Sequence, residues 1–404
     1  MRNGSSFRLH KGDILDAEKQ KAVEQKFDWQ NVLTLSLGHL LHDTYSSFLA
    51  PVLPLLIRRL GLSYSLAGLL AVFQRAPSLI NPLIGLLAER VTLRYFVIIA
   101  PTVTAIVMSL LPLAPNYTII VMLLLIMGLS SSLFHVPAPV MVRWVSGKRI
   151  GTGMSFFMLG GELARSIGPL VILGAISLWG MKGTYKLIPF GAGASLFLYI
   201  RLKNICKMRT AHAARNKRSA VEAIRELKAF FLLIAGLSFS RAIITTALTA
   251  FLPTYLIGQG NSLWQAGISL SILELAGAAG TFASGSISDL IGRRSMLLIQ
   301  AVVAPLLMVL FIFSTGFWLL PVLVLLGFFI FASTPVLMAL VQETAHDYPA
   351  VANGIYMTLN FIISSLTIML IGYLSDWLGM KNAYLIAAAL SFSGIPLVLL
   401  LKEK

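Results

Sequence analysis

The sequence predicts an all-α polytopic membrane protein with about twelve transmembrane helices in two six-helix bundles. Three observations lead to this fold class. Of the 404 residues, 57% are hydrophobic and only 12% are charged, whereas a soluble domain carries about a quarter charged residues. Apolar stretches of about 20 residues, the length that crosses a bilayer, recur almost without a break. A polar stretch near the middle of the chain separates six of them from the other six.

The expected transmembrane spans follow one another with short connections, and each rests on the length of its apolar run. Glycine and proline are scattered through these runs, as bundled membrane helices tolerate. The boundaries are set at the polar residues that flank each run. The expected spans cover residues 30–57, 64–88, 95–112, 117–142, 152–179 and 185–201, followed by 229–257, 264–288, 295–314, 317–341, 352–376 and 383–401.

Two polar segments set the domain boundaries. Residues 1–28 form a polar tail of mixed charge without an apolar run, which argues against a cleaved signal peptide. Residues 202–228 form a basic linker. The expected order is therefore a cytoplasmic tail, a six-helix bundle over 29–201, the linker, and a second six-helix bundle over 229–404.

The chain has an excess of basic residues, with 32 Lys and Arg against 16 Asp and Glu, for a formal net charge of +16. On a soluble surface such an excess would indicate nucleic-acid binding. Here 24 of the 32 basic residues fall on the side of the N-terminus and 5 on the opposite side. The positive-inside rule then places both termini and the linker in the cytoplasm. The charge reflects membrane orientation, and no nucleic-acid partner is expected.

A glycine–acid–arginine pattern ends the second span and recurs 200 residues later at the end of the eighth. Parallel repeats of this kind are typical of transporters built from two similar halves. Glycine allows close helix approach, and the acid can pair with arginine, so we predict a cytoplasmic ion-pair latch between helices. The alternative is an acid flanked by arginines that only set topology. The residues are Gly85, Glu89, Arg90 and Arg94, and then Gly285, Asp289, Arg293 and Arg294.

Ionisable side chains near the middle of the spans are costly in lipid and are usually functional or paired. Three arginines and three carboxylates are expected at this depth, and their charges sum to zero. They predict a polar cavity between the two halves rather than a lipid-facing surface. The six residues are Asp43, Arg75, Glu162, Arg165, Arg241 and Glu274.

The first span carries His39, His42 and Asp43. His39 and Asp43 are four residues apart and share a helix face, whereas His42 is expected to point elsewhere. An acid hydrogen-bonded to an imidazole can exchange a proton near neutral pH. We predict a proton site at Asp43 with His39, the alternative being a structural pair. His135, flanked by serines and a proline in the fourth span, is either a proton relay or a structural histidine.

Guanidinium groups do not titrate, so the arginines of the spans either pair with acids or bind an anionic group. Glu162 and Arg165 lie three residues apart and can neutralise each other. Arg241 can equally pair with Glu274, a second candidate proton relay, or contact a substrate. The residues expected at a substrate site are Gln74, Arg75, Arg165, Arg241, Glu162 and His42.

Several strings resemble one family. The glycine–acid–arginine pattern is similar to the loop motif of the major facilitator superfamily, and the glycines and proline of the fifth span are similar to the helix-5 motif of drug–proton antiporters. The chain from about residue 30 resembles the fosmidomycin-resistance branch of the superfamily. The strings that carry this likeness are Gly38-His39-Leu-Leu-His42-Asp43, Ser131-Ser-Leu-Phe134-His135-Val-Pro137, Leu159-Gly160-Gly161 with Gly168-Pro169, Phe239-Ser240-Arg241, Pro335-Val336 through Gln342-Glu343, and Gly372-Tyr-Leu-Ser-Asp376.

This resemblance implies a bacterial inner-membrane exporter that exchanges protons for drugs, small phosphonates among them. We therefore expect a monomeric, proton-coupled antiporter of a small anionic or amphipathic compound in the lipid bilayer. An organic-anion importer or exchanger is the alternative, and a non-transporting membrane receptor is a third possibility. No enzyme activity, cofactor or metal site is expected, because the sequence shows no nucleotide loop or metal-ligand cluster, and Cys206 is its single cysteine.

Overall fold

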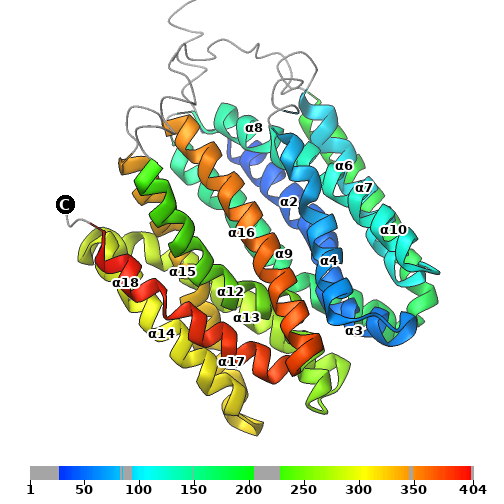
Figure 1. The fold of residues 1–404 in the computed structure, drawn as a ribbon. Coiled ribbons are helices and arrows are strands. Elements are labelled where there is room, and N and C mark those ends of the chain that lie inside the picture. The colour runs from blue at the N-terminus through cyan, green and yellow to red at the C-terminus, as the bar shows by residue number, and fades with distance from the viewer. Residues whose placement is uncertain are drawn as a thin grey trace, which may run out of the picture.

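The computed structural model describes residues 27–81, 84, 93–147, 149–203, 228–344 and 349–401. Within these ranges the regular structure is entirely helical. Figure 1 shows long helices running roughly side by side, with the blue-to-cyan helices of the N-terminal half to the right and the yellow-to-red helices of the C-terminal half to the left. The polar tail up to residue 26 and the linker over 204–227 fall outside the described residues.

The N-terminal half comprises α2 (Trp29–Ser46), α3 (Leu49–Leu60), α4 (Tyr64–Arg75), α6 (Leu93–Leu110), α7 (Tyr117–His135), α8 (Pro137–Val145), α9 (Ile150–Trp179) and α10 (Ile188–Leu202). The C-terminal half comprises α12 (Lys228–Gly258), α13 (Leu263–Ile291), α14 (Arg293–Phe313), α15 (Leu319–Thr344), α16 (Pro349–Leu378), α17 (Met380–Ser391) and α18 (Gly394–Leu399). Short 3₁₀ turns join several of them, including η1 (Ala76–Ile80).

Ten spans in the described ranges are long and apolar enough to cross a membrane. They correspond to ten of the twelve expected spans, with α2 and α3 forming one span over 29–60. The expected span over 64–88 begins with α4 and continues past residue 81 into residues that are mostly outside the description. The expected span over 185–201 corresponds to α10, which has only 15 residues.

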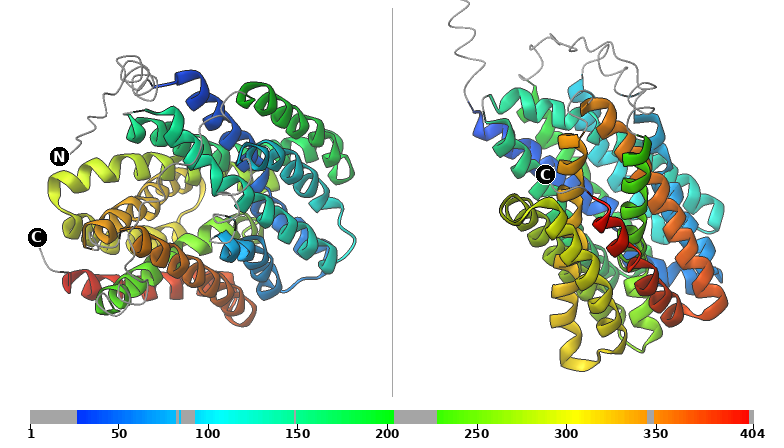
Figure 2. Two further views of the ribbon diagram at one scale, coloured as in Figure 1. Left: turned by 90° about the horizontal axis from the view of Figure 1, so that it is seen from above. Right: turned by 60° about the vertical axis from the view of Figure 1, so that its left-hand side comes forward.

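The apolar cores show where the two halves meet. One cluster joins both halves and includes Leu53, Leu70, Phe251 and Leu270. A second cluster lies entirely in the C-terminal half and a third entirely in the N-terminal half, near the start of α2. The halves therefore pack together where α3 ends and α4 begins, which we call the closed end, and have separate cores at the end where α2 and α12 begin. Figure 2 shows the two groups of helices from two further directions.

The closed end contains a polar contact between the halves. Asp376, near the end of α16, accepts hydrogen bonds from the backbone N–H groups of Tyr64 and Ser65 at 2.6 and 2.8 Å and from the Ser65 hydroxyl. The first N–H groups of a helix have no partner within it and carry the positive end of its dipole. Two glycines allow this approach, because a Cβ on Gly372 would lie 2.7 Å from the Tyr64 carbonyl oxygen and one on Gly68 would lie 3.0 Å from that of Ile368. Asp376 thus caps a helix of the opposite half.

Replacing Asp376 with Asn should weaken the closed end, because a neutral amide cannot accept from three donors as a carboxylate does. Cysteines introduced at the exposed Leu113 and Gln259, in a Cys206→Ser background, can carry spin labels. Double electron–electron resonance between the labels then measures the separation of the halves. We expect a longer-distance population in Asp376→Asn. Asp28→Asn is the matched control, because Asp28 caps α2 within its own half. Identical distance distributions in Asp376→Asn and wild type would show that the cap does not hold the halves together.

Candidate functional site

Two helix breaks bring polar groups to the interface between the halves. The first span breaks between α2 and α3, and the second changes from α4 to η1 after Arg75. Gln74 links the two breaks, since its side-chain amide donates to the Ser46 carbonyl at 2.8 Å. Gly128 of α7 lies against the second break, where a Cβ would come within 2.8 Å of Pro77. Discontinuous helices of this kind form substrate and ion sites in transporters.

A cavity of about 550 Å³ lies between the halves, with walls from α2, α3, α4, α7, α9, α12, α13, α15 and α16. This volume is in the range of small-molecule sites. Five of the six ionisable residues expected at mid-membrane depth line it, and the sixth, Glu162, contacts one of the five. The charged and imidazole side chains of its wall are Asp43, Arg75, His135, Arg165, Arg241 and Glu274.

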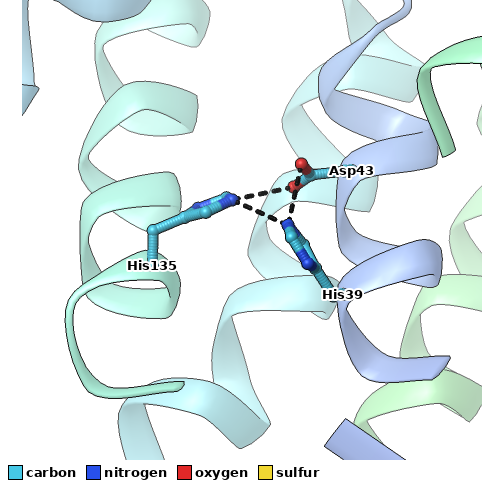
Figure 3. Close-up of side chains that lie close together, drawn as sticks. All are labelled: His39, Asp43 and His135. Carbon is cyan, nitrogen blue, oxygen red and sulfur yellow. Dashed lines mark hydrogen bonds and ion pairs between the residues drawn. The ribbon is translucent and has the colours of Figure 1, made fainter. Parts of the chain in front are cut away.

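The N-terminal wall contains a compact group formed by Asp43, His39 and His135. Figure 3 shows His135 of α7 facing the other two side chains, which come from α2. The His39 Nε2 lies 3.1 Å from the His135 Nε2 and 3.2 Å from the Asp43 Oδ2. The His135 Nε2 lies 3.3 Å from the Asp43 Oδ1. The expected pairing of His39 with Asp43 is therefore present, and His135 completes a triangle.

The backbone sets the tautomers of both imidazoles. The Nδ1 of His39 lies 2.7 Å from the Phe157 carbonyl oxygen, and the Nδ1 of His135 lies 2.9 Å from that of Ser131. A carbonyl only accepts, so both Nδ1 atoms carry a proton. The neutral rings consequently present two Nε2 lone pairs to each other and to the Asp43 carboxylate. In this state the two Nε2 atoms and the two carboxylate oxygens are all acceptors, so a proton or another cation between them would stabilise the group.

His42 lies elsewhere than expected. Its ring is fully buried and does not line the cavity, and its Nδ1 lies 2.8 Å from the Asp43 Oδ1. Its Nε2 lies 3.1 Å from the Thr104 hydroxyl, which donates to Ser130 at 2.9 Å. The expectation that His42 points away from Asp43 is wrong, because the ring of an adjacent residue can fold back against the carboxylate. In this structure His42 supports Asp43 and does not face the cavity.

Arg165 of α9 joins the two halves by charge. It forms an ion pair with Glu162 one turn earlier, and its Nε lies 3.5 Å from the Glu274 Oε2 of α13. Glu274 is 6% exposed, and its Oε2 accepts no hydrogen bond from a described residue. A buried carboxylate that stays ionised needs such compensation. The sequence left open a pairing of Glu274 with Arg241, but among the described residues Arg165 lies beside Glu274 instead.

Arg75 and Arg241 have no carboxylate within 4.0 Å among the residues that the structure describes. Arg75 is exposed to the cavity. Arg241 donates to the Thr334 hydroxyl at 2.6 Å, and its buried Nε lacks a hydrogen-bond partner in the described part of the chain. In the described part of the chain neither guanidinium forms an ion pair with an acid, and the Glu274 carboxylate attracts Arg75 only from a longer distance.

The glycines of the fifth span pack α9 against α2, as the small-residue pattern predicts. A Cβ on Gly161 would lie 2.5 Å from the His39 ring, and one on Gly168 would lie 2.6 Å from the Thr44 carbonyl oxygen. At these distances an added Cβ would force the His39 ring or the Thr44 backbone to move. The glycines thus place the backbone of α9 directly behind the His39 imidazole.

The second copy of the predicted latch contains ion pairs within the C-terminal half. Arg293 pairs with Asp289 at 2.5 Å and with Glu343 of α15 at 3.0 Å, and Arg294 donates to the Leu399 carbonyl at 2.9 Å. The close helix approach expected at Gly285 is wrong in this conformation, because no described atom lies within 4 Å of a Cβ built there. In the described part of the chain the Arg293 ion pairs do not connect the two halves.

The first copy of the latch is largely outside the described residues, which include neither Gly85, Glu89 nor Arg90. Arg94 is described, and its guanidinium lies over the Tyr95 ring at 4.8 Å and donates to the Lys203 carbonyl. The predicted pairing of Glu89 with its neighbouring arginines stays a prediction.

Sequence reasoning missed several polar partners of the site. Thr104 supports His42, Thr334 contacts Arg241, and Asp376 caps α4. Single hydroxyls inside apolar spans resemble ordinary helix residues that bond their own backbone. The weak signal available was that Thr104 and Thr334 interrupt runs of otherwise apolar side chains.

Sequence comparison identifies the family. The family model of the Major Facilitator Superfamily matches residues 35–368. The chain belongs to the major facilitator superfamily. It is 26% identical over 372 residues to the Fosmidomycin resistance protein of Escherichia coli K12, covering 89% of this chain and 90% of that protein. It is 24% identical over 393 residues to the uncharacterised MFS-type transporter YfnC of Bacillus subtilis 168, covering 93% and 94%.

Solved structures share the fold of this superfamily member. A bacterial homologue of the human lysosomal transporter Spinster, in an inward-facing and occupied conformation, superposes with a TM-score of 0.75 at 15% identity, covering 91% of this chain and 95% of that one. A point mutant of the nucleoside transporter NupG superposes with a TM-score of 0.74 at 14% identity, covering 92% and 100%. The protein is thus a multi-pass membrane protein of a transporter family.

Replacing Gly161 with Ala should displace the His39 ring, because the new methyl group would overlap it. We expect the variant to insert and fold but to have lost transport. Gly174→Ala is the matched control on the same helix, because nothing lies within 4 Å of a Cβ there. Uptake into proteoliposomes and thermal unfolding of the purified variants measure the two effects. Equal transport by both variants would show that the position of His39 is unimportant.

Proposed function

We propose that this protein is a secondary active transporter that exports a small anionic compound in exchange for protons. The observation that carries the proposal is the pair of arginines at the cavity, Arg75 and Arg241, that lack an acidic partner among the described residues. A guanidinium inside a membrane protein is costly unless an anion compensates it. An anionic substrate would supply that compensation, and arginine geometry suits carboxylates, phosphates and phosphonates.

The arrangement of the halves supports alternating access. The shared apolar core and the Asp376 cap seal one end, while the opposite end has two separate cores. If the termini are cytoplasmic, as the distribution of basic residues predicts, the closed end faces outward and this conformation is open inward. An exporter in the bacterial inner membrane would load its substrate in this state, and one monomer contains the whole cavity.

The substrate class follows from the cavity and from one relative. Three arginines at a cavity of about 550 Å³ suit a compact anion. The Escherichia coli relative is named for resistance to fosmidomycin, and at 26% identity we extend to this chain only the class of small phosphonates and similar anionic drugs. Export, rather than uptake, is the direction that resistance requires.

Glu274 is the group proposed to couple proton movement to the change of conformation. It lies in the C-terminal half and pairs with Arg165 of the N-terminal half. A proton on Glu274 would remove its charge and weaken this pairing, so the halves would be free to rearrange in the proton-loaded, substrate-free state that antiport requires. Asp43, His39 and His135 form a second group at the same cavity, to which we assign cation binding.

The principal alternative is an importer or exchanger of organic anions, for which the same arginines suffice. Transport driven by a counter-substrate without a proton gradient would favour it. A non-transporting receptor would use the basic linker over 202–228 to bind a partner or anionic lipid. Transport that persists after partial deletion of this linker would exclude that function.

Replacing Arg75 or Arg241 with Gln should weaken binding of fosmidomycin by about tenfold or more, since a hydrogen bond to a charged group contributes about 1.5–3 kcal/mol. Calorimetry on the purified variants measures the affinity. Arg58→Gln is the matched control, because Arg58 is an exposed arginine at the end of α3 that does not line the cavity. Unchanged affinity in both cavity variants would contradict the anion site.

Replacing Glu274 with Gln should separate exchange from proton-driven transport. The variant cannot release a proton at this position, so we expect export driven by a pH gradient to be lost. Exchange of labelled for unlabelled substrate across the vesicle membrane should persist, because it needs no net proton movement. Full pH-driven transport in Glu274→Gln would remove Glu274 from the coupling mechanism.

A further inference from the structure

We propose that His39, Asp43 and His135 form a binding site for a divalent transition-metal ion such as Zn²⁺, with one coordination position open toward the cavity. The sequence gives no hint of this site, because the third ligand is 92 residues beyond Asp43 and on another helix. The three side chains converge only because α7 places His135 opposite the face of α2 that carries His39 and Asp43 (Figure 3). Their ligand atoms all lie within 4.8 Å of one another.

The spacing of the ligand atoms fits one small metal ion. The two Nε2 atoms lie 3.1 Å apart, the His39 Nε2 lies 3.2 Å from the Asp43 Oδ2, and the His135 Nε2 lies 3.3 Å from the Oδ1 of the same carboxylate. A tetrahedral Zn²⁺ with bonds of about 2.0–2.1 Å holds its ligand atoms about 3.3–3.4 Å apart. Two imidazole nitrogens and a carboxylate oxygen are also ligands that Zn²⁺ and its neighbours prefer.

The surroundings orient the ligands as they are oriented in metal sites. Each histidine commits its Nδ1–H to a backbone carbonyl, that of Phe157 for His39 and that of Ser131 for His135. Hydrogen bonds of this kind fix the tautomer of metal-binding histidines and leave the Nε2 lone pair for the ion. The His39 ring also stacks on Phe157, with ring centroids 4.1 Å apart. The site therefore needs little rearrangement to bind.

Charge balance favours a cation at this position. The Nε2 lone pairs of His39 and His135 and the Asp43 carboxylate are all acceptors. One proton can bridge only one of the three contacts among these side chains. A metal ion would bind all three side chains at once. Arg165 is the nearby permanent cation, and its charge is compensated by Glu162 and Glu274. A divalent ion would thus meet the negative charge of Asp43 without an uncompensated arginine beside it.

The burial pattern defines the open position. The His39 side chain is 5% exposed and that of Asp43 8%, whereas that of His135 is 35% exposed. Asp43 and His135 line the cavity. Three protein ligands with a fourth position free is the arrangement of zinc sites that bind an outside ligand. If the proposed function holds, an oxygen of the anionic substrate would take this position.

The experiment measures Zn²⁺ affinity of the purified full-length chain by competition with a chromophoric chelator, without a membrane gradient. We expect one tight site. We also expect a loss of affinity above about tenfold in His39→Gln and in His135→Gln, because even the loss of an outer-shell partner typically costs about 10–100-fold. The chain offers a matched control in its other histidines away from the spans. The triple variant His10→Gln, His212→Gln and His346→Gln should keep the tight site.

Co²⁺ in place of Zn²⁺ adds a readout of geometry, because a tetrahedral Co²⁺ site absorbs visible light far more strongly than hydrated Co²⁺. We expect this absorption in wild type and its loss in His135→Gln, with thermal unfolding confirming that the variant is folded. Fosmidomycin should change the spectrum by entering the open position. Zn²⁺ affinity unchanged by both single variants, or lost in the triple control, would overturn the proposal. Absent transport with this metal site intact would overturn only the proposed function.

Discussion

The half-exposed guanidinium of Arg165 joins the two halves of this protein by charge. It pairs with Glu162 in its own half and with Glu274 in the other. Charges removed from water are stable only when they compensate one another. Because of this interaction, the carboxylates of Glu162 and Glu274 can lie inside a membrane protein. The interaction also constrains how the halves move. Any change that separates α9 from α13 must supply new partners for these groups.

The remaining charges of the cavity are arranged around this interaction. Because Arg165 takes both glutamates, Arg75 and Arg241 are left without an acid in the described part of the chain, and the cavity favours an anion. Asp43 in turn is surrounded by three imidazoles, His39, His42 and His135. The site therefore separates into a region that attracts anions and a region that attracts a cation, on walls that different helices contribute.

The fold could be predicted from the sequence almost completely, because apolar runs and flanking charges are local signals that a bilayer enforces. The same signals placed the six ionisable residues at one depth, and the structure confirms that five line a single cavity. Side-chain partners were less predictable. The i and i+4 spacing of His39 and Asp43 was sufficient for that pair, but the contact of His42 with Asp43 depends on a rotamer. The contacts of His135, Glu274 and Asp376 depend on helix packing, which no local pattern specifies.

The measurement that tests this account most directly is proton flux during transport by the wild-type protein. Proteoliposomes containing a pH-sensitive dye and no imposed pH gradient receive fosmidomycin on one side only, with an uncharged phosphonate diester as the control. We expect protons to move against the direction of fosmidomycin and the diester to cause no proton movement. Transport of fosmidomycin without any change of internal pH, or equal transport of the diester, would contradict it.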